Sequence, residues 1–527
     1  MSSKTPSSAT IAQALGQRVR GEILTDERTL TRYATDMSMY QVRPLVVVIP
    51  RDLEDVVAVV RFARESGLPL TPRGGGTSTA GSALGRGILL AFQRNGPMNQ
   101  VLDFERVNGE PQVTVEPALL HDNLQAFLRE RGLYLPADPS SGAVCLMGGN
   151  IATKASGPHA LKHGSIDRYL RHLQFVTAEG EVVDTADEGS IPLRVRQGVL
   201  ALRDDVLADA QTVQRLRARQ NMKLASGYNL FTFLRHEQGG DFVAQLLVGS
   251  VGTLGVITQA TLLAEPYIEG KSTMSLYFRD LHEAGDAVQY IKNLGVAAIE
   301  IMNHRAIAIV KERRAELEAP EGESHMLLVE FEGPERHAQV AQVEELVRQR
   351  DYDLAWPPRT AQDEAEQAQL WKLRKSLLPT IRGYRRDRVA LSLVNDVGVD
   401  VARLADFILD AQAIFERHGL VAGIYGHAGS GNLHLRPLFD PSDPDLSALL
   451  VRLADEVYET VFRYDGTITA EHGMGRLRTS YLAGEWGETI VGYMRRVKQI
   501  FDPDDLLNPD VMFSTRALTD DLKSLSR

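Results

Sequence analysis

The chain has 527 residues, more than one ordinary domain holds, so we expect two or three hydrophobic cores. Its 43% hydrophobic and 24% charged residues are typical of a globular protein, and a net charge of -11 without a basic run excludes nucleic acid as an expected partner. The single cysteine, Cys145, excludes an intrachain disulfide and an all-cysteine iron–sulfur cluster.

The N-terminal sequence lacks the apolar core of a signal peptide, and no segment has the roughly 20 apolar residues of a transmembrane helix. We therefore expect a cytoplasmic protein, and peripheral contact with the inner face of the membrane is left open. Residues 1–40 are expected to form an N-terminal helical segment.

The first half of the chain predicts alternating strands and helices. Residues 44–50, an apolar run bounded by prolines, predict a buried strand, and residues 53–66 predict an amphipathic helix. Three successive glycines follow in a loop at residues 73–81. Glycines let backbone N–H groups converge, and Thr77 and Ser78 add hydroxyl donors, so this loop can bind an anion such as a pyrophosphate. It is neither a Rossmann fingerprint nor a P-loop, and a flexible connector is the alternative.

Two more glycine-rich segments follow. Residues 136–164 form a long run of small and polar residues, which is unfavourable as plain loop because glycine loses much backbone entropy on ordering. Contact with a large ligand would explain it. Residues 246–258 alternate β-branched residues with glycine and predict a strand that turns past a flat ligand.

Two glycine-rich segments near the C-terminus contain His427, His434, Glu471 and His472. The spacing of the first two histidines would place them on opposite faces of a straight strand, so the glycines between them argue for a turn that folds them together. With Glu471 they would make three N/O ligands, which leaves a position open for water or substrate. His472 would then be free to accept a proton. The alternative is two turns with surface histidines.

In this order, the glycine loop, the two later glycine-rich segments and the histidine motifs resemble an FAD-dependent family. That family joins a vanillyl-alcohol-oxidase-type (PCMH-type) flavin domain to the C-terminal domain of flavin-linked D-lactate, D-2-hydroxyglutarate and glycolate dehydrogenases, and the resemblance covers residues 33–512. It implies an α+β fold in which a two-subdomain FAD-binding domain at residues 41–268 precedes a substrate or cap domain with an antiparallel sheet at residues 269–512. A C-terminal segment would return to the FAD domain, and residues 513–527 would form a tail.

The resemblance implies FAD as cofactor, bound without a covalent bond as in most relatives; a bond to His159 or His163 is the alternative. Val251 stands where the family usually has Glu. The residues implied to contact FAD are those that match the family's glycine-rich motifs and its closing Leu-Asn-Pro segment: Arg73, Gly74, Gly75, Gly76, Thr77, Ser78, Gly81, Pro139, Ser140, Gly148, Gly149, Asn150, Ala152, Thr153, Gly157, Gly252, Val256, Ile257 and Asn508.

The resemblance also implies a metal site and a catalytic set. His427, His434 and Glu471 match the ligands of relatives that bind a divalent metal, which implies zinc or manganese here, although Ser430 replaces the Asp usual beside them. The implied catalytic residues are the proton-abstracting His472, the substrate-neighbouring Asn432, and Arg374, whose counterpart holds the substrate carboxylate.

The substrate implied is a D-2-hydroxy acid such as D-lactate, D-2-hydroxyglutarate or glycolate. Val394 stands where some 2-hydroxyglutarate enzymes have a Lys, which weighs against that acid. A cluster of Arg382, Arg385, Arg386 and Arg388 could bind the far carboxylate of a diacid or could simply solvate an exposed segment. Glu300 matches a strand that borders the active site, and a purely structural role is as well supported.

We therefore expect an FAD-dependent dehydrogenase that oxidises the hydroxy acid to a 2-oxo acid. Electrons would pass to an external acceptor: a quinone, a cytochrome, an electron-transfer flavoprotein or a separate iron–sulfur subunit. The alternatives are an FAD oxidase that acts on an alcohol, aldehyde or sugar, and a non-catalytic flavoprotein subunit of a larger oxidase. A homodimer is left open.

Overall fold

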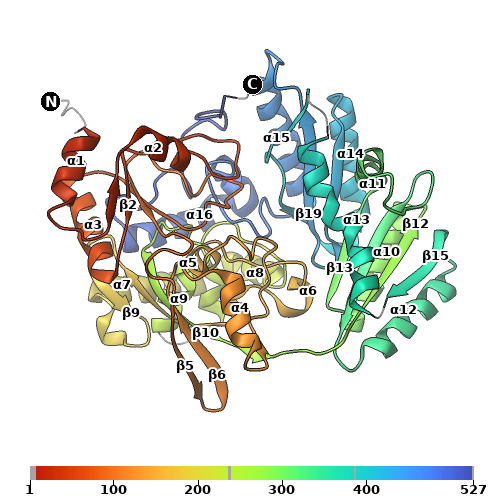
Figure 1. Cartoon of the computed structure of the whole chain (residues 1–527), viewed down its shortest axis with the longest axis horizontal. Helices are drawn as coiled ribbons and strands as arrows, with labels where there is room; N and C mark the ends of the chain where they lie inside the picture. Colours follow the sequence, from red (N-terminus) through yellow and green to blue (C-terminus); the bar gives the residue numbers. More distant parts are fainter. Residues whose placement is uncertain (1–6, 236–238, 362, 385–386, 525–527) are drawn as a thin grey trace.

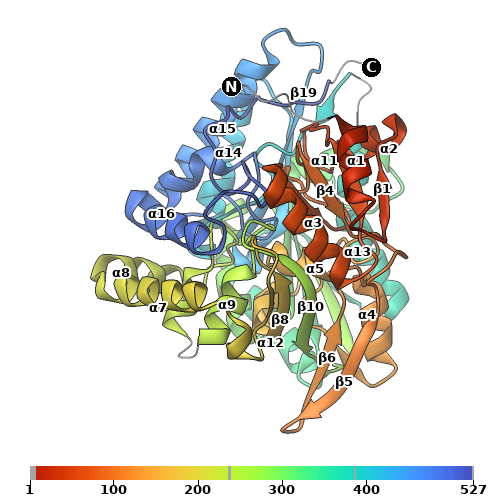
Figure 2. The same cartoon turned by 90° about the vertical axis from the view of Figure 1, so that its left-hand side faces the viewer.

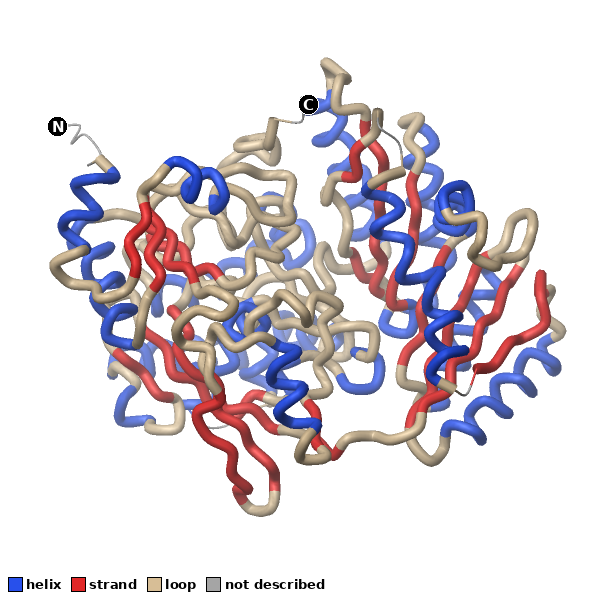
Figure 3. The backbone as a smooth tube through the Cα atoms, in the orientation of Figure 1, coloured by secondary structure: helices blue, strands red, loops and turns tan. Residues whose placement is uncertain are grey.

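This computed structural model describes residues 7–235, 239–361, 363–384 and 387–524. The chain forms two parts that lie side by side, each with its own β-sheets (Figure 1). The N-terminal part contains a four-stranded and a five-stranded sheet, and the C-terminal part contains an eight-stranded sheet. Loops make up much of the chain where the two parts face each other (Figure 3). In the described residues, no helix has the length and apolar character needed to cross a membrane.

The four-stranded sheet leads into the first glycine loop. Its order is β1-β2-β4-β3, with β1 (Glu22–Leu24), β2 (Val46–Ile49), β3 (Leu70–Arg73) and β4 (Ile88–Ala91). β2 and β3 run parallel to β4, and helix α3 (Leu53–Ser66) connects β2 to β3. Asp52 caps the start of α3 through the Asp55 N–H, and Gly67, with a φ of 65°, ends it. The predicted strand and helix are confirmed. Two helices, α1 (Ser8–Leu15) and α2 (Glu27–Tyr33), precede β2.

The five-stranded sheet is antiparallel, with the order β5-β6-β10-β8-β9. Figure 2 shows the β5–β6 hairpin extending from one end of the molecule, with α7 and α8 near α16 (Leu482–Phe501) on the other side. The elements of this region are β5 (Val101–Val107), β6 (Glu110–Val115), α4 (His121–Arg129), β7 (Leu133–Tyr134), β8 (Leu170–Val176), β9 (Val182–Asp184), α7 (Leu193–Ala208), α8 (Ala210–Arg219), α9 (Gly239–Leu247), β10 (Val256–Leu263) and β11 (Glu265–Pro266).

Two of the glycine-rich segments differ from expectation. The glycines of residues 136–164 predict no helix, but α5 (Met147–Ala152) and α6 (Ala160–His163) form there, because the Gly148 N–H bonds the Pro117 carbonyl and tertiary packing overrides low helix propensity. The strand predicted over residues 246–258 is wrong in its first half. Helix α9 ends at Leu247, and positive φ angles at Val251 and its flanking glycines make a turn before β10.

The eight-stranded sheet of the C-terminal part has the order β15-β12-β14-β13-β18-β19-β16, with β17 also paired to β19, and every pairing in it is antiparallel. Helices α10, α12, α14 and α15 pack on one face, and α11 and α13 cover part of the other. The elements are β12 (Lys271–Phe278), α10 (Leu281–Ile291), β13 (Ala298–Met302), α11 (His304–Arg313), β14 (His325–Glu332), α12 (Arg336–Arg350), β15 (Leu354–Ala361), α13 (Glu364–Arg382), β16 (Val389–Ala390), β17 (Val397–Gly398), α14 (Leu404–Arg417), β18 (Ala422–His427), β19 (Asn432–Phe439) and α15 (Leu446–Arg463).

The register of this sheet gathers ionisable residues on the face that α13 shares. Antiparallel pairing sets Ala298 opposite Glu330, Tyr425 opposite His434 and His427 opposite Asn432, and residues two apart on a strand share a face. The same face therefore carries these side chains from four adjacent strands: Glu330, Glu332, Glu300, His427, His434 and Arg436.

The C-terminal segment returns to the N-terminal part, as predicted. Helix α16 (Leu482–Phe501) packs against α7, and Leu507 bridges to Leu70 of β3. The Asn508 side chain then donates to the carbonyls of Ser82 and Val251, at 2.8 and 2.7 Å. This residue ties the first and third glycine-rich segments together.

Candidate active site at a flavin cavity

A cavity of about 450 Å³ lies where the glycine-rich segments meet the C-terminal part, a size typical of ligand sites. All the residues expected to contact FAD line it except Gly81, Gly157, Val256 and Asn508. On the other side, Leu378 of α13, Arg436 of β19, Glu471 and His472 complete the wall. The cavity therefore places the predicted base and one predicted metal ligand against the dinucleotide loops.

The lining has room and donors for a dinucleotide. A Cβ on Gly149 would meet nothing within 4 Å among the described residues, whereas one on Gly75 would lie 2.4 Å from the Val144 carbonyl oxygen. Gly149 thus leaves open space at the cavity wall, and Gly75 allows close backbone approach. The Thr79 hydroxyl also lines the cavity, buried and without a hydrogen-bond partner in the described part of the chain. These features fit a bound FAD.

Three of the predicted residues meet at one carboxylate oxygen. The Nε2 atoms of His427 and His434 each lie 3.4 Å from Oε1 of Glu471, and all three ligand atoms lie within 4.8 Å of one another. The turn predicted between the two histidines is confirmed: residues 428–430 connect β18 to β19, and the two imidazoles lie diagonally across this strand pair with ring centroids 5.3 Å apart. Two imidazoles and a carboxylate suit zinc or manganese, and three ligands leave a coordination position open. The donor set fits a divalent cation.

The partners of each ligand fix its orientation. His434 Nδ1 bonds the Asn395 carbonyl at 2.9 Å, and His427 Nδ1 bonds the buried Glu300 carboxylate. The second oxygen of Glu471 accepts from Lys223 Nζ at 2.5 Å. Both histidines turn Nε2 toward Glu471, so the nitrogens that would bind a cation point to the same place. The Ser430 hydroxyl, which stands where the family resemblance implies Asp, donates to the His427 carbonyl at 3.2 Å.

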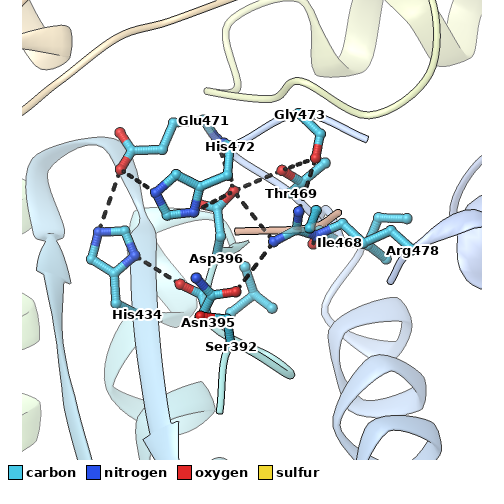
Figure 4. Close-up of polar contacts among 12 residues, drawn as sticks. Ser392, Asn395, Asp396, His434, Ile468, Thr469, Glu471, His472, Gly473 and Arg478 are labelled. Atoms are coloured by element: carbon cyan, nitrogen blue, oxygen red, sulfur yellow. Dashed lines mark hydrogen bonds and ion pairs between the residues drawn. The ribbon is translucent and has the colours of Figure 1, made fainter. Parts of the chain in front are cut away.

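Asp396 contacts both the predicted base, His472, and the predicted metal ligand Glu471 (Figure 4). Its Oδ2 accepts from the backbone N–H of His472 at 2.8 Å and of Glu471 at 3.1 Å, and it lies 3.5 Å from His472 Nδ1. Its Oδ1 accepts from Asn432 Nδ2 at 2.9 Å. Asn432 does not line the cavity, and its own Oδ1 is buried without a partner in the described part of the chain.

Burial and neighbouring charges shift the pKa values in opposite directions. Burial lowers the pKa of His434 to about 3, and it lowers the pKa of His472 more than the Asp396 and Glu471 carboxylates raise it. Burial also disfavours a charged His427, but the Glu300 carboxylate outweighs it and raises that pKa. Burial would raise the pKa of Glu471, yet Lys223 and His427 hold it well below the ordinary value. His472 is therefore neutral at pH 7 and able to accept a proton.

Arg374 lies beside the cluster but outside the cavity lining. Its Nε and Nη2 lie 2.8 and 2.7 Å from Oε2 of Glu300, and its guanidinium lies 4.5 Å from the Tyr425 ring centroid. The predicted role of Arg374 in holding a substrate carboxylate stays a prediction. Of the downstream arginine cluster, Arg385 and Arg386 and the Arg382 side chain fall outside the described residues, and Arg388 pairs with Asp440 at 3.0 Å.

His159 and His163 contact carboxylates rather than the cavity. His159 Nε2 lies 2.7 Å from Glu330 while its Nδ1 bonds Asp138, and His163 Nε2 lies 2.7 Å from Glu332. Neither histidine lines the cavity. Both therefore connect the N-terminal part to strand β14.

Sequence reasoning missed Lys223, Asp396 and Arg436. The first two lie far along the chain from Glu471, so no local pattern connects them with it. Arg436 had a signal: Asn432, His434 and Arg436 alternate with leucines, which predicts one shared strand face.

Comparisons with known proteins agree with this geometry. Residues 44–186 match the family model for an FAD binding domain, and residues 269–512 match the model for the C-terminal domain of FAD linked oxidases. The chain is 30% identical to the probable mitochondrial D-lactate dehydrogenase of Danio rerio, over 91% of this chain and 86% of that one. It is 27% identical to the D-2-hydroxyglutarate dehydrogenase of Escherichia coli, over 94% of this chain and 50% of that one, so it spans about half the length of that relative.

A solved structure shares the fold. The 4-ethylphenol oxidase of Gulosibacter chungangensis superimposes with a TM-score of 0.67 at 17% identity, over 96% of this chain and 97% of that one. The match is at the level of fold, and the identity to the D-lactate dehydrogenase carries the family assignment. The chain belongs to the FAD-linked oxidase family, in which an FAD binding domain is followed by the FAD linked oxidase C-terminal domain.

Proposed function

We propose that this protein is an FAD-dependent dehydrogenase that oxidises a D-2-hydroxy acid to the 2-oxo acid. One observation carries the proposal: Glu471 and His472 line the same cavity as the dinucleotide loops, and Glu471 meets His427 and His434 at its other side. This proximity supports a site in which the proposed metal ligands and base would act next to the proposed flavin site. The printed names of the relatives, D-lactate and D-2-hydroxyglutarate dehydrogenase, agree with this substrate class.

The two groups that the site fits have complementary chemistry: FAD supplies a hydride acceptor, and a divalent cation lowers the pKa of a coordinated hydroxyl. His427, His434 and Glu471 would hold the cation, and the glycine loops would hold FAD. His472 takes the hydroxyl proton at Nε2, because its Nδ1 faces Asp396. Asn432, whose Oδ1 has no hydrogen-bond partner within the described ranges, would be an acceptor beside the cluster.

We further propose non-covalent FAD and zinc or manganese as the cation. Both ring nitrogens of His159 are engaged by carboxylates, which supports non-covalent binding. Residues 41–268 would act as the FAD-binding unit and residues 269–512 as the substrate unit. The electron acceptor would be external, a quinone, a cytochrome, an electron-transfer flavoprotein or an iron–sulfur subunit, since Cys145 is the chain's one cysteine.

Anaerobic titration of the oxidised flavoprotein with D- and L-2-hydroxy acids tests the proposal. D-Lactate, L-lactate, glycolate and D-2-hydroxyglutarate form the panel, with a simple alcohol and an aldehyde as comparisons. Bleaching of the flavin by a D-acid, with about one equivalent of zinc or manganese in the same preparation, is the expected result. A flavin that stays oxidised with every acid but is bleached by an alcohol or aldehyde would overturn the substrate class.

A further inference from the structure

The cavity contains a buried cation that the cluster of histidines and carboxylates does not neutralise. Arg436 is only 6% exposed, and it lines the cavity together with Glu471 and His472. It lies on β19 two residues after His434, so both side chains share the face that looks toward the dinucleotide loops. On the neighbouring strand β18, the residue opposite Arg436 is Gly423, which has no side chain beside that of Arg436.

The guanidinium of Arg436 has few partners. Its Nη1 donates to the Ser392 hydroxyl at 3.1 Å, and its buried Nε has no hydrogen-bond partner in the described part of the chain. No carboxylate of the described residues lies within 4.0 Å of it. A buried charge without a counter-ion is unfavourable, and proteins normally pair or hydrogen-bond such groups fully.

Other buried arginines nearby follow that rule. Arg478 donates to the carbonyls of Ile468 and Gly473 at 3.1 and 2.9 Å, and Arg374 is paired twice with Glu300. Arg374 is therefore neutralised by the protein itself and lies outside the cavity lining. Arg436, by contrast, is buried in the cavity wall, and its guanidinium has donors that are not engaged by the described residues.

We propose that Arg436 binds the carboxylate next to the reacting carbon of the substrate, and so restricts the site to anionic substrates. This assignment rests on the proposed function. A guanidinium matches a carboxylate with two parallel hydrogen bonds, and an incoming carboxylate supplies the missing counter-ion. The position two residues from His434, about 7 Å along a strand, sets the anion site close to the metal ligands.

The test compares a charged substrate with its neutral amide in Arg436→Gln and Arg436→Lys. Flavin reduction by D-lactate and D-lactamide gives the preference for the carboxylate, and oxalate, which has no carbon-bound hydrogen to transfer as hydride, gives binding alone from the perturbation of the flavin spectrum. We expect Arg436→Gln to weaken the binding of D-lactate and oxalate by roughly 10- to 150-fold, since hydrogen bonds to a charged group have that strength. The binding of D-lactamide should change little. Arg436→Lys should recover part of the loss.

Arg452→Gln, a change of an exposed arginine on α15, is the matched control and should leave all three ligands unaffected. Flavin content and thermal midpoint establish that each variant is folded. If Arg436→Gln binds oxalate and D-lactate as the unmodified protein does, or weakens only a dicarboxylate such as D-2-hydroxyglutarate, the assignment is overturned.

The results distinguish a failure of the proposed function from a failure of the proposed anion site at Arg436. If hydroxy acids bleach the flavin and Arg436→Gln has no effect, the function stands and the anion site does not. If no hydroxy acid bleaches the flavin but oxalate binding depends on Arg436, the anion site stands and the proposed reaction does not. If the folded Arg436→Gln variant is too unstable to hold flavin, Arg436→Lys carries the comparison between D-lactate and D-lactamide, and an unchanged preference there also overturns the assignment.

Discussion

At the scale of single residues, Asp396 has the widest influence on the site. It is fully buried and holds the His472 and Glu471 backbone through one oxygen and Asn432 through the other. In Asp396→Asn one of these oxygens becomes an NH₂ group that faces donors. We expect flavin reduction to slow by about 100-fold with a smaller change in KM, because base positioning contributes about 10²–10⁴-fold. Anaerobic stopped-flow measurement checks this; a rate close to that of the unmodified protein would rule out this role in positioning the base.

Lys223 gives a second prediction at this scale, one about metal removal. Its ammonium pairs with one oxygen of Glu471 at 2.5 Å, while three imidazoles, those of His427, His434 and His472, lie 3.4–3.6 Å from the other oxygen. Removing one partner of a buried pair costs about 3–5 kcal/mol, so Lys223→Met should destabilise the metal-free protein by that order. Added zinc should recover much of the loss, since the cation takes over the charge of Glu471. Urea unfolding in EDTA and in zinc checks this. Equal stabilisation of both proteins by zinc would contradict it.

At the scale of elements, the sequence predicted those turns and helices that residues close together in the chain determine. The β18–β19 turn followed from the glycines around His427, and α3 followed from its apolar stripe. Helix α5 could not be predicted, because its glycines disfavour a helix and distant segments stabilise it, for example through hydrogen bonds to the carbonyls of Pro117 and Leu119. For the same reason the links from Lys223 and Asp396 to Glu471 could not be predicted, since the fold alone brings them together.

Helix α5 offers a prediction that separates folding from cofactor binding. A Cβ on Gly149 meets no described atom within 4 Å, and replacing an interior helical glycine by alanine contributes about 0.5–1 kcal/mol of stability. Gly149→Ala should therefore keep or raise the stability of the flavin-free protein. It should weaken the binding of FAD, because the added methyl group would enter the space that FAD occupies. Thermal unfolding and fluorescence titration with FAD measure the two effects. Gly492→Ala on α16, which is equally unhindered, is the control and should leave FAD affinity unchanged.

At the scale of the whole molecule, charged contacts connect the two parts beside the cavity. His159 lies between Asp138 of the N-terminal part and Glu330 of β14, while Lys162 and His163 reach Glu332 on the same strand. The ionisable side chains that β14, β13, β18 and β19 place on one face of the eight-stranded sheet thus have two roles. Those on β14 hold the N-terminal part in place, and those on β18 and β19 form the site.

This contact predicts how stability depends on pH. The Asp138 and Glu330 carboxylates outweigh burial and raise the pKa of His159 to about 10, from 6.5. A raised pKa means that the charged histidine stabilises the fold fully below pH 6.5, and that this contribution is lost as the pH rises toward 10. His159→Gln should lower stability by about 1–3 kcal/mol at pH 6, because it removes the charged partner that Asp138 and Glu330 share, although Glu330 keeps Lys271 at 2.6 Å. The difference from the unmodified protein should shrink toward pH 10. Unfolding in urea at a series of pH values measures this difference. A gap that stays constant across the range would show that His159 acts through packing rather than charge.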